Sequence, residues 1–191
     1  MEKITAHILI ATFVLMTVSI APLPAGAQGP ANVPKFPLPV AMTSPGQAPE
    51  GEIVNLLFER NKMKVHYDPS MPPNDLKGHK TLIVILGGSG KGLGSAGVDI
   101  RDELNRANAL LNEAKKLGIK LVGMHLGGED RRGEVSAKFI DLLAPKMAHL
   151  TVRADGNKDN KFTEIAKKNK IPLTIVNKNA EVAEVLKKMF E

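Results

Sequence analysis

The feature that most limits how this chain can fold is an uninterrupted apolar run at residues 81–86, with the sequence TLIVIL. A run of this kind, without alternating polar residues, is typical of a strand that is covered on both faces. Such strands occur in parallel sheets, where helices pack on each side. We therefore expect residues 81–86 to form a central strand of an α/β protein.

Segments that predict strands and segments that predict helices alternate along the chain. The predicted strands are residues 37–43, 64–68, 81–86, 120–126, 149–154 and 172–176, and the predicted helices are residues 50–62, 99–117, 134–144, 160–169 and 180–190. Right-handed crossover connections then determine most of the topology. The sequence predicts an α/β fold, a three-layer α/β/α sandwich around a mostly parallel sheet of five or six strands.

The apolar positions of the helices predict their buried faces. In the first helix we expect burial of Ile53, Leu56, Leu57 and Met63. In the second, a stripe at three- or four-residue spacing faces the core; its members are Ile100, Leu104, Ala107, Leu111 and Ala114. No internal repeat is present.

One connection lacks a good helix. Residues 68–80 contain Pro72-Pro73 and predict at most one helical turn. In this respect the chain resembles flavodoxin-like proteins within the wider Rossmann-like class. The resemblance implies the strand order 2-1-3-4-5, with a sixth strand to follow, and not 3-2-1-4-5. In such sheets ligands bind beyond the carboxyl ends of the strands, at the switch point between the first strand and the third.

The N-terminal 27 residues have the three parts of a secretory signal peptide. Lys3 gives a weakly positive start, residues 8–21 form an apolar run without a charge, and Ala25-Gly26-Ala27 fits a small-x-small cleavage site. The apolar run is too short to span about 30 Å of hydrocarbon comfortably. We expect cleavage near Ala27 and no stable membrane insertion afterwards. The protein is then exported, to the periplasm or the cell exterior.

The remaining chain is predicted to be a tether at residues 28–36, rich in Pro, Gly and Ala, and one α/β domain at residues 37–191. The composition excludes several functions. There is no Cys for a disulfide or a thiol nucleophile, and no Trp and one Tyr to stack on a flavin or a nucleobase. The net charge is +6, but the basic residues form no stripe with interleaved aromatics, and the histidines form no close pair. We expect no cofactor, no metal and no nucleic-acid partner.

Four unusual segments follow the first, third, fourth and fifth predicted strands. They are residues 43–47 (TSPGQ), 87–97 (GGSGKGLGSAG), 125–133 (HLGGEDRRG) and 155–159 (DGNKD). Because the carboxyl ends of parallel strands lie at one edge of a sheet, these segments should meet there. The loops at the opposite edge are short and ordinary, so the asymmetry predicts that the carboxyl edge binds something.

We predict that the ligand at this edge is a small polar or anionic molecule. Glycines let backbone N–H groups approach an anion at a helix N-terminus, and Lys91, Arg131, Arg132 and Lys158 add positive charge. Carboxylates in the same loops could instead neutralise these cations, and the glycines could form only a linker. The predicted ligand-binding residues are Ser44, Gly46, Gln47, Gly87, Gly88, Ser89, Gly90, Lys91, Gly92, His125, Gly127, Gly128, Glu129, Arg131, Arg132, Asn157 and Lys158.

The glycine segment does not match known nucleotide-binding motifs well. Gly90-Lys91 is followed by Gly92 and not by Ser or Thr, so it is not a Walker A loop. Residues 92–97 match the dinucleotide fingerprint, but they begin about five residues past the strand and lack the expected carboxylate downstream. The sequence therefore favours neither a Walker A nucleotide site nor a dinucleotide site.

Two other functions stay open. The chain could be an extracytoplasmic hydrolase or transferase, because Ser89 lies at a strand–turn–helix junction and His125 and Asp155 end neighbouring strands. The segment lacks the final Gly of G-x-S-x-G, so Ser89 and His125 are runner-up catalytic residues only. The chain could also be a structural or protein-interaction domain whose loops contact a partner chain. We favour a binding module, with an envelope transporter or sensor as a further partner, over an enzyme.

Together the signal peptide and the segments TSPGQ, VILGGSGKGLGSAG, GMHLGGEDRRG and DGNKD resemble a family of small exported bacterial single-domain proteins of unknown function. The resemblance covers residues 37–191. It implies a bacterial origin and export. It brings no catalytic residue, ligand or cofactor.

The signal peptide makes a direct prediction about the protein in the cell. Removal of 27 of the 191 residues leaves a mature chain of 164 residues that starts at Gln28. Expression of the full coding sequence in a bacterial host, followed by intact-mass measurement of the exported and cytoplasmic fractions, should find this species outside the cytoplasm. An uncleaved chain that stays with the membrane would contradict the prediction.

Overall fold

The computed structural model describes residues 33–191. The predicted signal peptide and most of the predicted tether lie outside the described residues. Within the described part, no helix is long and apolar enough to cross a membrane.

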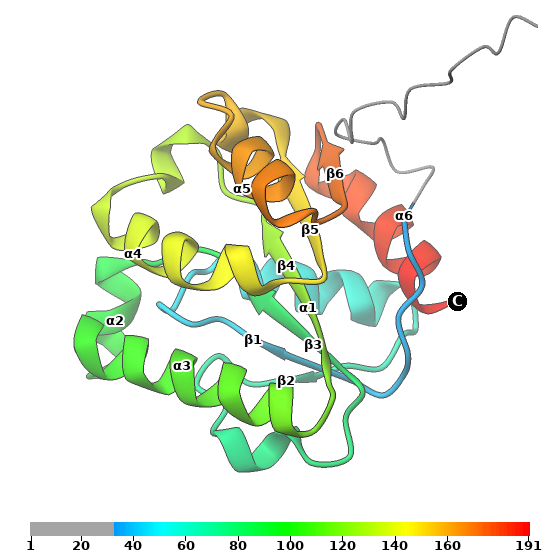
Figure 1. Ribbon diagram of the computed structural model, residues 1–191, viewed down its shortest axis with the longest axis horizontal. Helices are drawn as coiled ribbons and strands as arrows, with labels where there is room; N and C mark the ends of the chain where they lie inside the picture. The colour runs from blue at the N-terminus through cyan, green and yellow to red at the C-terminus, as the bar shows by residue number, and fades with distance from the viewer. Residues whose placement is uncertain (1–32) are drawn as a thin grey trace, which may run out of the picture.

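Six parallel strands form one sheet with the order β2-β1-β3-β4-β5-β6 (Figure 1). The strands are β1 (Val40–Thr43), β2 (His66–Tyr67), β3 (Thr81–Ile85), β4 (Lys120–His125), β5 (His149–Arg153) and β6 (Leu173–Val176). The helices are α1 (Glu50–Arg60), α2 (Gly90–Ala96), α3 (Ile100–Lys116), α4 (Glu134–Leu143), α5 (Lys161–Asn169) and α6 (Asn179–Phe190). The predicted α/β class and strand order are confirmed.

Strand β3 lies inside the sheet, between β1 and β4, and all five of its residues are buried. Its alternate side chains enter two separate cores, because successive residues of a strand point to opposite faces. Leu82 and Val84 belong to the core under α3, α4 and α5, whereas Ile83 and Ile85 belong to the core under α1 and α6 (Figure 1). This two-sided burial explains the uninterrupted apolar run.

The predicted buried face of α1 is right only in part, because Leu57 and Met63 are partly buried against the core as expected, whereas the other two predicted residues are not. Val54 and Phe58 are fully buried, whereas Ile53 and Leu56 are 38% and 43% exposed. Gly51 on the same face as Val54 leaves no room for a Cβ against the Tyr67 ring. This glycine lets α1 lie close to β2, and that approach turns Ile53 and Leu56 toward solvent.

The glycine-rich segment after β3 contains a helix that the sequence did not predict. Helix α2 begins after Ser89, whose Oγ accepts a hydrogen bond from the Gly92 backbone N–H at 3.0 Å. It ends at Gly97, which has a left-handed φ of 67°. Leu93 is 4% exposed and anchors the helix. Cap and anchor together offset the low helix propensity of the glycines.

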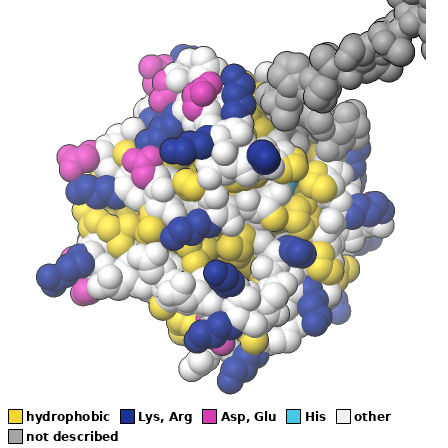
Figure 2. All heavy atoms as spheres, in the orientation of Figure 1, with side chains coloured by type: hydrophobic (Ala, Val, Ile, Leu, Met, Phe, Trp, Pro, Cys, Tyr) yellow, Lys and Arg dark blue, Asp and Glu magenta, His cyan; other side chains and the backbone are white. Residues whose placement is uncertain are grey.

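The basic residues do not gather into one stripe on the face that carries α3 and α4. Figure 2 shows Lys and Arg side chains scattered over this face between apolar patches. Asp and Glu side chains concentrate toward the upper left of the same view.

Candidate functional site

The loops that follow β1, β3, β4 and β5 meet at the carboxyl edge of the sheet, as the topology requires. The Ser89 backbone N–H donates to the Gly46 carbonyl at 2.8 Å. Gly88 bonds the hydroxyl of Ser136 through its N–H at 3.1 Å and through its carbonyl at 3.0 Å. The Arg132 guanidinium donates to the Gly156 carbonyl. Four segments that are distant in sequence therefore form one connected surface.

The turn after β1 fills the switch point instead of opening it. Gly46 has a φ of 87°, and a Cβ there would lie 2.5 Å from the Gly87 carbonyl oxygen and 2.7 Å from Phe139 Cδ2. Ser44 is fully buried and donates from Oγ to the Ala48 carbonyl at 2.7 Å. The expected crevice between the first and third strands is therefore occupied by the chain's own backbone.

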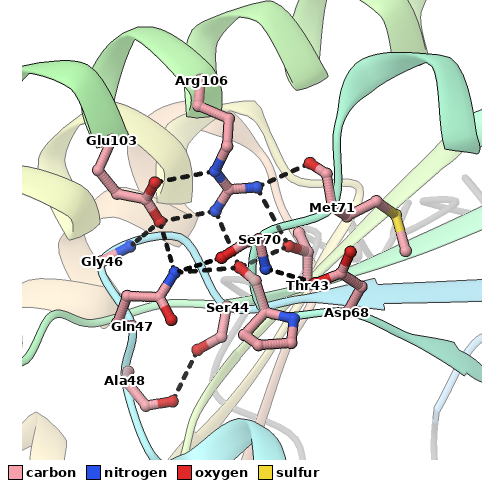
Figure 3. Close-up of polar contacts among 11 residues, drawn as sticks. Thr43, Ser44, Gly46, Gln47, Ala48, Asp68, Ser70, Met71, Glu103 and Arg106 are labelled. Carbon is pink, nitrogen blue, oxygen red and sulfur yellow. Dashed lines mark hydrogen bonds and ion pairs between the residues drawn. The ribbon is translucent and has the colours of Figure 1, made fainter. Parts of the chain in front are cut away.

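A buried carboxylate on α3 holds this turn in place (Figure 3). The Glu103 side chain is 3% exposed, and its Oε1 accepts from the Gly46 N–H at 3.1 Å and from Gln47 Nε2 at 3.2 Å. Burial opposes ionisation of Glu103, but its bonds to Arg106 and the nearby positive charge outweigh that effect. The pKa of Glu103 consequently lies below its ordinary value.

Arg106 extends the contact to a second loop. Its guanidinium bonds Glu103 at 2.7 Å and 2.8 Å, and it donates to the Pro69 carbonyl at 2.9 Å and the Met71 carbonyl at 2.8 Å. The loop between β2 and β3 is thus tied to α3 (Figure 3). We call Glu103, Arg106 and Gln47 the α3 clamp. The sequence contains one signal for it, since Glu103 precedes buried Ala107 by four residues and so lies on the apolar face of the helix.

A cleft of about 240 Å³ lies beside the clamp, between the start of α2 and the start of α4. Its lining residues are Gly88, Ser89, Gly90, Asp130, Arg131, Gly133, Glu134, Val135 and Ser136. Of these, Gly88, Ser89, Gly90 and Arg131 are predicted ligand-binding residues. The contribution of α4 was missed, because Glu134 to Ser136 look like an ordinary exposed helix start in the sequence.

The cations of these loops are largely neutralised within the chain. Arg131 Nε lies 3.5 Å from Glu50 Oε1, Arg132 pairs with Asp159 at 2.9 Å, and Lys158 pairs with Glu129 at 2.9 Å. Arg131 keeps 45% of its side chain exposed. Lys91 is also exposed and makes no ion pair among the described residues, but it does not line the cleft. Of the two alternatives that the sequence left open, three of the four cations follow the one in which carboxylates neutralise them.

The His125 side chain is buried inside the fold and is not exposed at the carboxyl edge. It is 2% exposed, its Nδ1 donates to the Leu86 carbonyl at 2.6 Å, and its ring lies 4.9 Å from the Phe162 ring. Burial lowers its pKa to about 4, so the ring is neutral at pH 7. Its Nε2 is buried without a hydrogen-bond partner in the described chain, and Gly156 covers that side of the ring.

The triad considered from the sequence is not assembled. Ser89 Oγ caps α2, His125 bonds Leu86, and the Asp155 carboxylate pairs with Arg153 at 2.5 Å. Each of the three side chains is thus engaged with another partner. Among residues 33–191, no base contacts the Ser89 hydroxyl.

Several other predicted ligand-binding residues are internal to the fold. Asn157 is 8% exposed, accepts from the Phe162 N–H at 2.9 Å and donates to Thr163, so it caps the start of α5. Gly127 and Gly128 pack against the side chains of Arg131 and Arg153. The buried members of the predicted set are Ser44, Gly46, Gly87, His125, Gly127, Gly128 and Asn157. They shape the edge but offer little surface to a ligand.

Residues 38–190 match the family described as a domain of unknown function, DUF6305. The chain belongs to this family. The matched range lies within the residues that carry the family resemblance in the sequence. Among curated proteins, no relative matches the chain.

Solved structures with a similar layout include three bacterial proteins. A protein described as lipolytic, of the G-D-S-L family, from Desulfitobacterium hafniense is 13% identical, with a TM-score of 0.34, over 71% of this chain and 75% of its own. A GDSL-like lipase from Bacteroides thetaiotaomicron is 14% identical, with a TM-score of 0.34, over 73% and 71%. A protein described as an acylhydrolase from Bacteroides fragilis is 11% identical, with a TM-score of 0.34, over 76% and 72%. At these values the likeness carries no argument about activity.

The α3 clamp predicts unequal effects for two identical substitutions on one helix. Glu103→Gln should lower the free energy of unfolding by about 2–4 kcal/mol, because it leaves the partly buried Arg106 without its counter-charge. Glu113→Gln removes an exposed pair with Lys116 at the same three-residue spacing and should cost less than about 1 kcal/mol. Urea unfolding of both variants measures the difference. Equal, small losses would show that the clamp is not a stabilising element.

Two buried histidines predict a pH dependence of stability. Burial lowers the pKa of both His125 and His149 to about 4, below the ordinary value of 6.5. Between these values the unfolded chain binds the protons and the folded chain does not, so stability is fully present above pH 6.5 and is lost as the pH falls toward 4. The limiting loss is on the order of 3 kcal/mol for each histidine.

Urea unfolding at a series of pH values between 7.5 and 4 checks this expectation. His149→Leu should reduce the slope, because both ring nitrogens of His149 are buried without a hydrogen-bond partner in the described chain. A stability that stays flat across this window would contradict the assignment.

Proposed function

We propose that this protein is a binding module for a small polar molecule, which enters the cleft between the starts of α2 and α4. The observation that supports the proposal is the cleft itself, which joins the loop after β3 to the loop after β4 at the carboxyl edge of the sheet. Ligands of open parallel sheets bind at this edge. The proposal places the site one strand away from the switch point, because the turn after β1 fills that position.

The lining groups suit a ligand with several hydrogen-bonding atoms. The hydroxyl of Ser89 lies at the start of α2, and α4 begins at Gly133 without a side-chain cap. Backbone N–H groups at an uncapped helix start are available as donors. Arg131 adds a half-exposed guanidinium. Together these groups favour a hydroxylated or carboxylated compound over an apolar one.

The charges of the lining favour a zwitterionic or hydroxylated ligand over a simple multivalent anion. Asp130 and Glu134 line the same cleft as Arg131. A dianion would be attracted by the arginine but repelled by both carboxylates. An amino acid or an amino sugar can pair with charged groups of the lining, and a neutral sugar carries no charge that these groups would repel.

We propose further that binding takes place outside the cytoplasm, a proposal that rests on the predicted signal peptide alone. A bound cargo would then pass to an envelope transporter or sensor. We propose binding in preference to hydrolysis, because Ser89, His125 and Asp155 are each bonded to other partners within the described residues.

Substitution of two glycines on α2 tests the site. Neither Gly90 nor Gly94 has an atom within 4 Å of a Cβ built on it, so a side chain leaves the backbone at either position without a clash. Gly90 lines the cleft and Gly94 does not. A thermal-shift panel of amino acids, sugars, organic acids and phosphate esters should find a ligand that raises the midpoint by about 5–10 °C at 100 times its Kd.

Gly90→Leu should abolish that shift, whereas Gly94→Leu, with the same gain in helix propensity, should retain it. Arg131→Gln should weaken a carboxylated ligand by at least about tenfold if the guanidinium contacts it. A panel without any shift would overturn the proposal and favour a structural or protein-interaction domain. A shift that survives Gly90→Leu would place the site elsewhere.

A further inference from the structure

A second cavity lies at the opposite edge of the sheet, where β1, β2 and β3 begin. Its volume is about 580 Å³. Residues that precede each of the three strands line it, including Leu38 before β1, Val65 before β2 and His79 before β3. Phe190 at the end of α6 closes one side. The cavity is therefore separate from the cleft at the carboxyl edge.

The floor of this cavity is apolar and continuous with the core. Val40 and Phe58 lie at its base and are 2% and 0% exposed. The Phe58 and Phe190 rings lie 5.8 Å apart. Met63 is only partly buried, and Leu38 is 56% exposed, so apolar side chains reach the surface around the opening. An alkyl chain laid on this floor would cover them.

The titratable side chains that line the cavity are all basic. They are Lys62, Lys64, His66 and His79, and no carboxylate is among the lining residues. Lys62 and Lys64 make no ion pair among the described residues, in contrast to Lys116, which pairs with Glu113. His79 Nδ1 is buried and has no hydrogen-bond partner in the part of the chain that the structure describes. The cavity thus offers two lysine cations and two imidazole rings beside an apolar floor.

We propose that this cavity binds a free carboxylic acid with a single alkyl chain of medium length, its tail on Met63 and Phe190 and its carboxylate against Lys62 and Lys64. The positive charge of the lining favours an anionic ligand, and the apolar floor favours a ligand with an alkyl chain. The volume falls within the range of about 300–1,000 Å³ that is usual for small-molecule sites. This site is independent of the proposed function at the carboxyl edge.

Decanoate is the probe. Decan-1-ol is the control for the charge, because it has the same chain length and no carboxylate, and butyrate is the control for chain length. The protein is produced from the full coding sequence and titrated at about 0.15 M salt, below the concentration at which decanoate aggregates. Calorimetry should show decanoate binding at least about tenfold more tightly than either control. With methionine methyl groups labelled, the Met63 resonance should move, whereas that of Met147, which packs in the other core, should not.

A matched pair of double variants locates the carboxylate. Lys62→Gln with Lys64→Gln removes the two lining cations, and Lys168→Gln with Lys170→Gln removes two lysines of the same spacing that do not line the cavity. Lys62 and Lys170 both have a φ of 56°, so the backbone strain is equal in the two pairs. The first pair should weaken decanoate by about tenfold or more and leave decan-1-ol unchanged. The second pair should change neither.

Four results would overturn the inference. They are the absence of a Met63 shift, equal binding of decanoate and decan-1-ol, equal effects of the two double variants, and binding of phosphatidylglycerol vesicles without binding of decanoate. The last would identify a lipid surface as the partner. Gly90→Leu should leave decanoate binding intact, so that failure at one edge is distinguishable from failure at the other.

Discussion

The buried ion pair between Glu103 and Arg106 is the constraint on which the arrangement of the carboxyl edge depends. Removing two charges from water costs several kcal/mol each, and only complete hydrogen bonding makes such a pair tolerable. Here the carboxylate is bonded by the turn after β1 and the guanidinium by the loop after β2. Helix α3 therefore holds together the turn after β1 and the loop after β2, which are separate in the sequence.

This constraint decides where ligands can and cannot approach. The clamp holds Gly46 against Gly87 and Phe139, and that contact closes the switch point at which ligands of similar sheets bind. The accessible surface is displaced toward β4, where α2 and α4 begin. At the other edge, Phe190 at the end of α6 and the segments before β1, β2 and β3 surround a cavity with an apolar floor. Lys and His side chains also line this cavity. The two proposed sites thus lie on opposite edges and do not share residues.

The elements that were predicted correctly depend on local sequence patterns, whereas those that were missed depend on contacts with other parts of the chain. Strand β3 was predicted closely, because burial on both faces leaves a mark that is local in the sequence. The buried face of α1 was predicted only in part, because it depends on how closely Gly51 lets the helix approach Tyr67. Helix α2 was missed, since its glycines have low helix propensity and its stability comes from the Ser89 cap and the burial of Leu93.

The sequence by itself determined the α/β class and the edge at which the unusual loops gather, because apolar periodicity and parallel strand direction are sufficient for these properties. The strand order was implied by the resemblance to flavodoxin-like proteins, which rests on the connection without a good helix at residues 68–80. Only the tertiary structure decided which loop residues face solvent. Ser44, His125 and Asn157 have the chemistry of ligand contacts in the sequence, but each is buried and bonded to the fold. Hydrogen-bonding capacity is a property of the residue, whereas its use depends on neighbours that come from distant parts of the chain.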